Sequence, residues 1–461
     1  MILRKAIEEI PGLRYITDQV DLLTAAGRRA FYALPFLVEL KAIKRQLELL
    51  DQYIAVIHQE DELSQFLHLK LSQIKDIKGT LANLEANNVL DDIELFELKS
   101  FAILADEIFS RASGSIEEVS HFPDLKTVIS SLDPEGNRVP SFYIYDLYSH
   151  PLAEKRKEVR LLRHNGQEKE ALEAYAEVIE IENKIRTTIS DELRTDYPAI
   201  LEAVELITRI DLHLAMANLC SGLQFIKPQL NTETLDIKGL FNPLVKDTLS
   251  KKGKSYQPID ITLQHGVCLI TGANMAGKTV LLKSLALSQA LLQFGFFIPA
   301  KEANLMPVQK ILISIGDEQS ELSGLSSFAA EMLKIDKILK SLGKTKFNLI
   351  LIDEPARTTN PTEGKALVNA LLDELSTQPS FSLVTSHYSG LTGNFKRLRV
   401  KGFCENSQTP TITAENISDF IDYSLVEDEK DTVPEEAIKI ATLLGIDKNF
   451  LAKAKEYRTG K

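Results

Sequence analysis

The fold of the second half of this chain is decided by one stretch, Gly272-Ala273-Asn274-Met275-Ala276-Gly277-Lys278-Thr279. It matches the pattern G-x-x-x-x-G-K-[ST] and lies between the apolar run GVCLIT and the helical run VLLKSLALSQALL. The glycines let backbone N–H groups face inward, and a helix N-terminus adds positive potential where phosphates would lie. We therefore predict a phosphate-binding P-loop, in which Lys278 reaches the β- and γ-phosphates and Thr279 holds Mg²⁺.

The alternative interpretation of this stretch is a glycine-rich turn that merely joins a strand to a helix. That interpretation leaves Lys278 and Thr279 to coincidence. We therefore expect ATP to be bound by the loop and the first helical turn, that is, by Gly272, Ala273, Asn274, Met275, Ala276, Gly277, Lys278, Thr279 and Val280.

A second motif follows the apolar run Phe347–Ile352, which ends in Asp353 and Glu354. Ligand sites in open α/β sheets lie at the carboxyl ends of the strands. Asp353 is placed to organise Mg²⁺, and Glu354 to orient the water that attacks the γ-phosphate. An ordinary surface turn would explain this motif if it stood alone, but its pairing with the glycine-rich loop favours an ATPase.

His387 follows the apolar run FSLVTS. If this run forms a strand parallel to the one before Asp353, both residues emerge at the same edge of the sheet. His387 would then contact the γ-phosphate or its water. The alternative is a loop histidine without a catalytic role.

The hydrophobic pattern of the sequence changes near the middle of the chain. Up to about residue 228 apolar residues recur at helical spacing, as in Leu201, Val204 and Ile207. Afterwards helical segments alternate with short β-type runs, which predict strands at GVCLIT, KILISI, FNLILID and FSLVTS. The fold class expected is α + α/β: a helical domain over residues 1–235, a P-loop α/β domain over 236–425 and a helical segment over 426–461. A break at Asn165 and Gly166 predicts a helical hairpin over about 152–195.

Composition limits the function classes. The 461 residues are 44% hydrophobic and carry a net charge of −12, which disfavours non-specific attraction to nucleic acid. The hairpin is charge-balanced, with eight Lys or Arg and eight Glu between Pro151 and Ser190, so a solvated lever is favoured over a nucleic-acid clamp. No apolar run is long enough to span a membrane, and the three cysteines suggest core thiols in a reducing cytoplasm.

Five segments occur in the order and approximate spacing of the ATPase domain of the MutS mismatch-repair family. They are GANMAGKT, GFFIPAKEANLMPVQKILISIG, SGLSSFAAEM, LILIDEPARTT and VTSHY. The resemblance is strong over residues 240–400 and looser in the N-terminal half, where it implies a MutS-like helical core with short levers. It implies a dimeric ATPase whose C-terminal helices help the subunits to dimerise, either as a homodimer or with a sister subunit.

The resemblance also implies roles for individual residues. The serine matching Ser326 reaches across to the nucleotide of the other subunit, and Tyr256 lies near the place of an adenine-stacking aromatic residue. The usual DEIGRGTST is DEPARTTNP here, which retains Arg357 and Thr359 but differs at Pro355, Ala356, Asn360 and Pro361. Communication between subunits is therefore expected to differ from that of the family.

The beginning of the chain looks like the inside of the helical core, so we expect no mismatch-reading domain. Two possible targets of the ATPase then remain, a protein or DNA. The chain resembles a branch of MutS-like ATPases that act as reactivases of the adenosylcobalamin-dependent lysine 5,6-aminomutase, which implies a protein client. The alternative is a DNA-binding ATPase that acts on mismatched or branched DNA in repair or recombination. A transporter-type ATPase is disfavoured because an LSGGQ-type signature is absent, and a non-enzymatic nucleotide-binding scaffold is disfavoured by Glu354.

Overall fold

The computed structural model describes residues 1–139, 141–272, 277–315, 327–404, 416–428 and 437–459. The chain forms two compact units. One unit contains the sheets and comprises Met1–Gln19, Pro35–Leu47 and Cys220–Lys461; the other is helical and comprises Val20–Leu34 and Glu48–Leu219. The sequence-based boundaries at residues 235 and 425 stay predictions.

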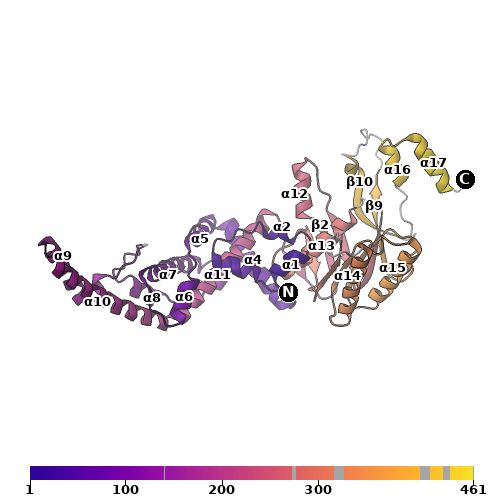
Figure 1. Ribbon diagram of the computed structural model, residues 1–461. Helices are drawn as coiled ribbons and strands as arrows, with labels where there is room; N and C mark the ends of the chain where they lie inside the picture. The colour runs from indigo at the N-terminus through magenta and orange to yellow at the C-terminus, as the bar shows by residue number, and fades with distance from the viewer. Residues whose placement is uncertain (140, 273–276, 316–326, 405–415, 429–436, 460–461) are drawn as a thin grey trace. The chain divides into compact units, whose positions relative to one another are not determined.

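The N-terminal region is helical, as expected (Figure 1). Its helices are α1 Leu3–Glu9, α2 Leu13–Thr17, α3 Ala25–Tyr32, α4 Leu40–Gln59, α5 Asp61–Gln73, α6 Lys78–Glu85, α7 Asp92–Ala112, α8 Lys126–Leu132, α9 His150–His164, α10 Glu168–Thr195 and α11 Tyr197–Gly222. Short 3-10 helices lie at Glu117–Val119 and Asp146–Tyr148. Helices α4 and α11 contribute residues to both units.

Helices α9 and α10 form an antiparallel hairpin that turns at Asn165–Gln167. Small and branched side chains are buried along it, including Val159 on α9 and Ala171, Ala174 and Val178 on α10. The spacing of 171, 174 and 178 gives α10 one apolar face, so the pairing follows from the sequence pattern. Among the described residues, each helix is too short or too polar to cross a membrane.

The N-terminal segment Pro35–Leu47 belongs to the sheet-containing unit and is bonded to the end of helix α13 (Lys278–Gln293). The Leu37 N–H donates to the Gln293 carbonyl at 2.8 Å, and the Gln293 side-chain amide donates to the Leu37 carbonyl at 2.7 Å. Phe36 packs edge-on against Phe294, with ring centroids 5.5 Å apart. These long-range contacts place Pro35–Leu47 with the sheets.

The strands form two sheets. They are β1 Gln229–Leu230, β2 Leu235–Leu240, β3 Ile259–Leu263, β4 Gly266–Thr271, β5 Glu302–Leu305, β6 Ile311–Ser314, β7 Leu349–Ile352, β8 Phe381–Ser386, β9 Lys396–Phe403 and β10 Ile421–Glu427. The larger sheet has the order β10-β9-β4-β8-β7-β6 and is parallel except for its edge strand β10. The smaller sheet has the order β1-β5-β2-β3. The strands predicted from GVCLIT, KILISI, FNLILID and FSLVTS are confirmed.

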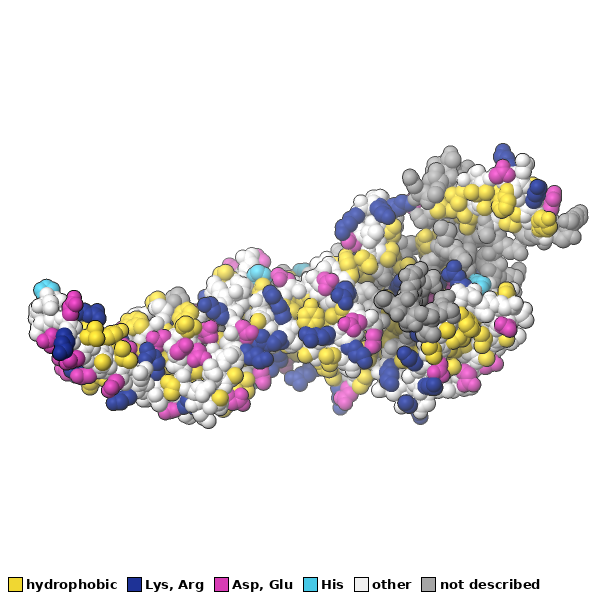
Figure 2. All heavy atoms as spheres, viewed as in Figure 1, with side chains coloured by type: hydrophobic (Ala, Val, Ile, Leu, Met, Phe, Trp, Pro, Cys, Tyr) yellow, Lys and Arg dark blue, Asp and Glu magenta, His cyan; other side chains and the backbone are white. Residues whose placement is uncertain are grey.

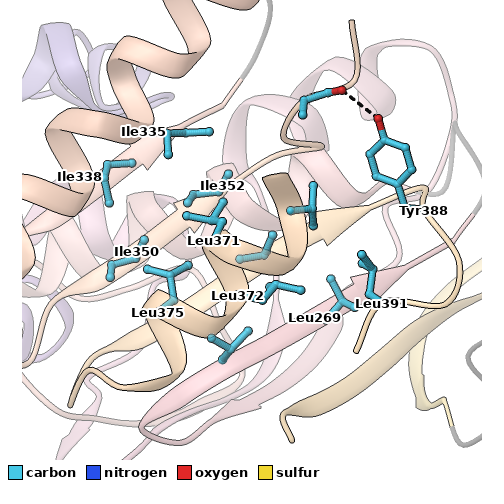
Figure 3. Close-up of a cluster of buried hydrophobic side chains, with 14 of the residues drawn as sticks. Leu269, Ile335, Ile338, Ile350, Ile352, Leu371, Leu372, Leu375, Tyr388 and Leu391 are labelled. Carbon is cyan, nitrogen blue, oxygen red and sulfur yellow. Dashed lines mark hydrogen bonds between the residues drawn. The ribbon is translucent and has the colours of Figure 1, made fainter. Parts of the chain in front are cut away.

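The remaining helices connect or follow these strands. They are α12 Pro243–Lys251, α13, α14 Ser327–Leu342, α15 Pro361–Ser376, α16 Ala437–Leu443 and α17 Lys448–Thr459, with a 3-10 helix at Ile417–Phe420. Helices α14 and α15 cover one face of the larger sheet (Figure 1), where Ile335, Leu371 and Leu372 pack with Ile350 and Ile352 of β7 (Figure 3). The alternate residues of β7 point to the opposite face, against which α13 packs.

One expectation about the cysteines is wrong. Cys220 and Cys268 are buried, and burial raises the pKa of each thiol to about 12. Cys404 is exposed, because it follows the last residue of β9, where the chain leaves the sheet. It is therefore not a core thiol.

Candidate functional site

The loop between β4 and α13 begins and ends with glycines in conformations that other residues adopt rarely. Gly272 has a φ of 151° and Gly277 a φ of 74°, and Gly277 caps the N-terminus of α13. A Cβ atom at Gly277 would also lie 2.9 Å from the ring of Tyr423 on β10. Glycine is therefore required at this position for two reasons. The candidate residues Ala273, Asn274, Met275 and Ala276 lie outside the described residues.

Lys278 is the first residue of α13 and is nearly buried. Its Nζ donates to the Gly272 carbonyl at 2.6 Å and lies 3.0 Å from Oε1 of Glu354. Only 4% of the Lys278 side chain and 12% of the Glu354 side chain are exposed. The carboxylate offsets the cost of burying the ammonium group and holds it at the loop. The structure thus brings together two residues that the sequence separates by the rest of α13, β5, β6, α14 and β7.

Thr279 and Asp353 meet directly. The Thr279 hydroxyl donates to Oδ2 of Asp353 at 2.5 Å, and the Thr385 hydroxyl donates to Oδ1 at 2.6 Å. The Asp353 N–H donates to the Ser314 carbonyl at 2.9 Å, which fixes the residue at the end of β7. Both carboxylate oxygens are therefore oriented by hydroxyl groups from neighbouring elements.

Thr385 is a residue of the site that the sequence pattern did not indicate. It is fully buried next to the end of β8, and besides contacting Asp353 its hydroxyl accepts the Glu354 N–H at 2.9 Å. The only signal for it was its place in FSLVTS, two residues before His387. A threonine in an apolar strand normally satisfies its hydroxyl locally, so its role depends on β8 lying beside β7.

His387 follows β8 and lies at the same edge of the sheet as Asp353, because β7 and β8 are parallel. Burial lowers the pKa of His387, and the positive charges of Lys278 and Arg357 lower it further, while Glu354 acts in the opposite direction. The neutral imidazole is therefore favoured at neutral pH. Val280, which follows Thr279 on α13, is partly buried.

Two tyrosines lie beside α13 or the glycine that caps it. Tyr256 is half-buried, and burial raises its pKa, while interactions with the backbone of Asn242 and the side chain of Ser284 on α13 lower it. Tyr423, which the sequence did not single out, lies over Gly277. Ser326 lies outside the described residues.

A magnesium ion would find oxygen ligands here. Among the described residues no group of three or more His, Cys, Asp or Glu side chains could hold a metal. The Thr279 hydroxyl and the Asp353 carboxylate are nevertheless adjacent, and Mg²⁺ is usually held by one or two protein oxygens together with water and substrate phosphates. The residues present fit such an ion.

Comparison with known proteins identifies this part of the chain. Residues 268–460 match the family described as MutS domain V. The chain is 30% identical over 292 residues to the DNA mismatch repair protein MutS of Oceanobacillus iheyensis, which covers 60% of this chain and 33% of that protein. It is 32% identical over 282 residues to the proteins of the same name from Bacillus thuringiensis and Bacillus cereus, covering 58% of this chain and 31% of each relative. The chain thus spans about a third of the length of these relatives. Residues 268–460 thus resemble MutS domain V, and this part of the chain is similar to the corresponding part of MutS proteins.

Proposed function

We propose that this chain binds ATP together with Mg²⁺ and hydrolyses it to ADP and phosphate. The observation that carries the proposal is the meeting of four side chains from two elements: Lys278 and Thr279 at the start of α13, and Asp353 and Glu354 at the end of β7. This set supplies a cation for the phosphates, oxygen ligands for a metal and a carboxylate for water.

Each of these residues has a separate role in the proposed reaction. Lys278 binds the β- and γ-phosphates, and Thr279 and Asp353 hold Mg²⁺, which neutralises phosphate charge. Glu354 orients the attacking water and accepts its proton, and the neutral His387 beside it contacts the same water or the γ-phosphate. The adenine-stacking role of Tyr256 rests on the resemblance alone.

Release of phosphate from MgATP by the purified chain tests this function. We expect turnover in the wild type and loss of nucleotide binding in Lys278→Ala. Lys340→Ala is the matched control, because Lys340 is an exposed lysine on α14 that pairs with Asp336. A wild type that binds no ATP, or a Lys278→Ala variant that binds it normally, would contradict the proposal.

The partner of this ATPase is a separate question, because the curated relatives are named as DNA mismatch repair proteins and this chain spans a third of them. The hairpin favours a protein client. Lys155 pairs with Glu158 and Glu177, Arg156 with Asp146 and Glu182, and Arg186 with Asp92. Basic groups bound in this way are not free to neutralise phosphates.

The hairpin also exposes apolar side chains: Leu161, Leu172, Tyr175 and Ile179 are 62%, 74%, 45% and 41% exposed. Figure 2 shows hydrophobic side chains at the surface of α9 and α10, with acidic and basic groups intermixed. Apolar surface of this kind is typical of protein-binding sites. The client that the sequence resemblance implies is the lysine 5,6-aminomutase, which this chain would reactivate.

A comparison of possible partners distinguishes a protein client from DNA. The ATPase rate is measured with mismatched duplex, with branched DNA and with an inactivated cobalamin-dependent aminomutase. ATP-dependent recovery of aminomutase activity would establish the protein client. Nanomolar DNA binding that weakens steeply with salt would instead establish the DNA-binding alternative.

A further inference from the structure

The backbone after β7 is strained where it carries the candidate water-orienting carboxylate. Glu354 has a φ of 44° and Ala356 a φ of 59°, although neither is glycine. Positive φ is uncommon for residues with a Cβ atom, and such conformations persist only when the surrounding structure enforces them. Pro355 stands between the two residues and has no N–H with which to hold the turn. The turn therefore needs fixation from outside.

Two side chains supply that fixation at Ala356. Oε1 of Glu331, on α14, accepts the Ala356 N–H at 2.8 Å. The Tyr388 hydroxyl donates to the Ala356 carbonyl at 2.8 Å, as the dashed line in Figure 3 shows. The two bonds engage the peptide groups on either side of the Ala356 Cα atom, which are the groups whose orientation sets its φ and ψ.

Tyr388 is itself held firmly. The residue is 8% exposed within the apolar cluster beneath α15, and its N–H donates to the Ser386 hydroxyl at 3.0 Å. A Cβ atom at Gly364 of α15 would lie 2.1 Å from the Tyr388 hydroxyl and 3.0 Å from the Ala356 carbonyl. Glycine at position 364 thus leaves the room that the hydroxyl occupies.

We propose that Glu331 and Tyr388 are positioning residues, which hold the strained turn at Ala356 so that Glu354 points at Lys278 and the reacting water. The proposal rests on the ATPase function proposed above. The Thr385 hydroxyl holds the Glu354 N–H from β8, so the turn is fastened at its start by Thr385 and at Ala356 by Glu331 and Tyr388. A small shift of this turn displaces the carboxylate without altering the phosphate-binding loop.

The first test separates positioning from binding. Tyr388→Phe keeps the ring and removes one hydrogen bond, and Glu331→Ala removes the other. Each should lower kcat about fivefold to tenfold, while the KM for ATP stays within about twofold of the wild-type value. Glu331→Gln retains an oxygen that accepts the Ala356 N–H, so it should keep wild-type kcat. Tyr457→Phe and Glu374→Ala are the controls, because both residues are exposed.

The second test does not depend on ATP hydrolysis. Amide hydrogen exchange of the peptide that contains residues 353–359 should speed up in Tyr388→Phe and in Glu331→Ala, and in neither control. Ala356→Gly in the Tyr388→Phe background should recover part of kcat, because glycine adopts positive φ without strain.

The outcomes distinguish this inference from the proposed function. If the wild type hydrolyses no ATP, the proposed function fails, and hydrogen exchange still decides whether Glu331 and Tyr388 hold the turn. If exchange in Tyr388→Phe and Glu331→Ala matches the wild type, the inference is overturned. A wild-type kcat in both variants of an active enzyme overturns it as well.

Discussion

Lys278 and Glu354 form a nearly buried ion pair, with 3.0 Å between Nζ and Oε1. Arg357 approaches the other oxygen, Oε2, at 3.4 Å. Glu354 therefore lies between two cations and next to His387, whose pKa responds to all three charges. This arrangement holds the carboxylate between the lysine at the loop and the guanidinium group of Arg357.

Glu354→Gln should separate binding from hydrolysis. The amide keeps the size of the side chain but accepts no proton, so ATP binding should persist while turnover falls at least about tenfold. Nucleotide binding and phosphate release measured on the same preparation check this. Glu363→Gln is the control, because Glu363 is exposed on α15. Unchanged turnover in Glu354→Gln would contradict the role of Glu354 as the base.

Thr385→Val should weaken both the proposed Mg²⁺ site and the fold. The change keeps the shape of the side chain but leaves Oδ1 of Asp353 and the Glu354 N–H without their partner. We expect the free energy of unfolding to fall by about 1–3 kcal/mol and the Mg²⁺ concentration for half-maximal turnover to rise. Urea denaturation and a Mg²⁺ titration measure the two effects. Thr377→Val, at an exposed threonine, should change neither.

The lowered pKa of His387 predicts how the free energy of unfolding depends on pH. The folded chain holds the pKa of His387 below the ordinary value of about 6.5, mainly through burial. As the pH falls through 6.5 the unfolded chain binds this proton first, so the contribution of His387 to stability is present above that pH and declines below it. His387→Gln should therefore flatten the decline in the free energy of unfolding below pH 6.5.

An NMR titration checks the cause of that shift. Lys278→Ala removes a neighbouring cation and should raise the pKa of His387, whereas Glu354→Gln removes an anion and should lower it. Lys340→Ala should leave the titration unchanged. The same midpoint in all four proteins would show that these charges do not reach the imidazole.

Ser326 is predicted to act in trans. Mixing a Ser326→Ala chain with a Lys278→Ala chain should restore one working site in each heterodimer, because one interface then combines an intact Lys278 with an intact Ser326. ATPase activity of the mixture, compared with that of each variant alone, measures the rescue. Absence of rescue in confirmed heterodimers would argue for a site complete within one chain.

Gln293 should be essential for holding the N-terminal segment against α13. It is fully buried and bonds to the Leu37 carbonyl and to both backbone groups of Val308. Gln293→Leu leaves three backbone groups unsatisfied and should lower the free energy of unfolding by about 2–4 kcal/mol. Thermal denaturation tests this, and faster proteolysis within residues 35–47 would locate the effect. An unchanged melting temperature would contradict the assigned role.

The sequence by itself determined the local elements of the site. The alternation of apolar runs and helical segments correctly predicted β4, β6, β7 and β8. A buried strand and an amphipathic helix each have a hydrophobic pattern that is visible within a short window of sequence. The glycines at 272 and 277 bound the predicted loop in the sequence, and in the structure both have positive φ. The order of strand, loop and helix also implied that Asp353 and His387 share an edge once the strands were taken as parallel.

Only the tertiary structure decided which distant residues complete the site. Thr385 reaches Asp353 because β8 pairs with β7, and Glu331 and Tyr388 meet at Ala356 because α14 and β8 flank the same turn. The N-terminal segment 35–47 joins the sheet unit through Gln293, a helical glutamine that local pattern would place on a polar surface. Such contacts depend on which strands and helices become neighbours. That choice is made by burial and hydrogen bonding across the whole unit, and no short window of sequence contains it.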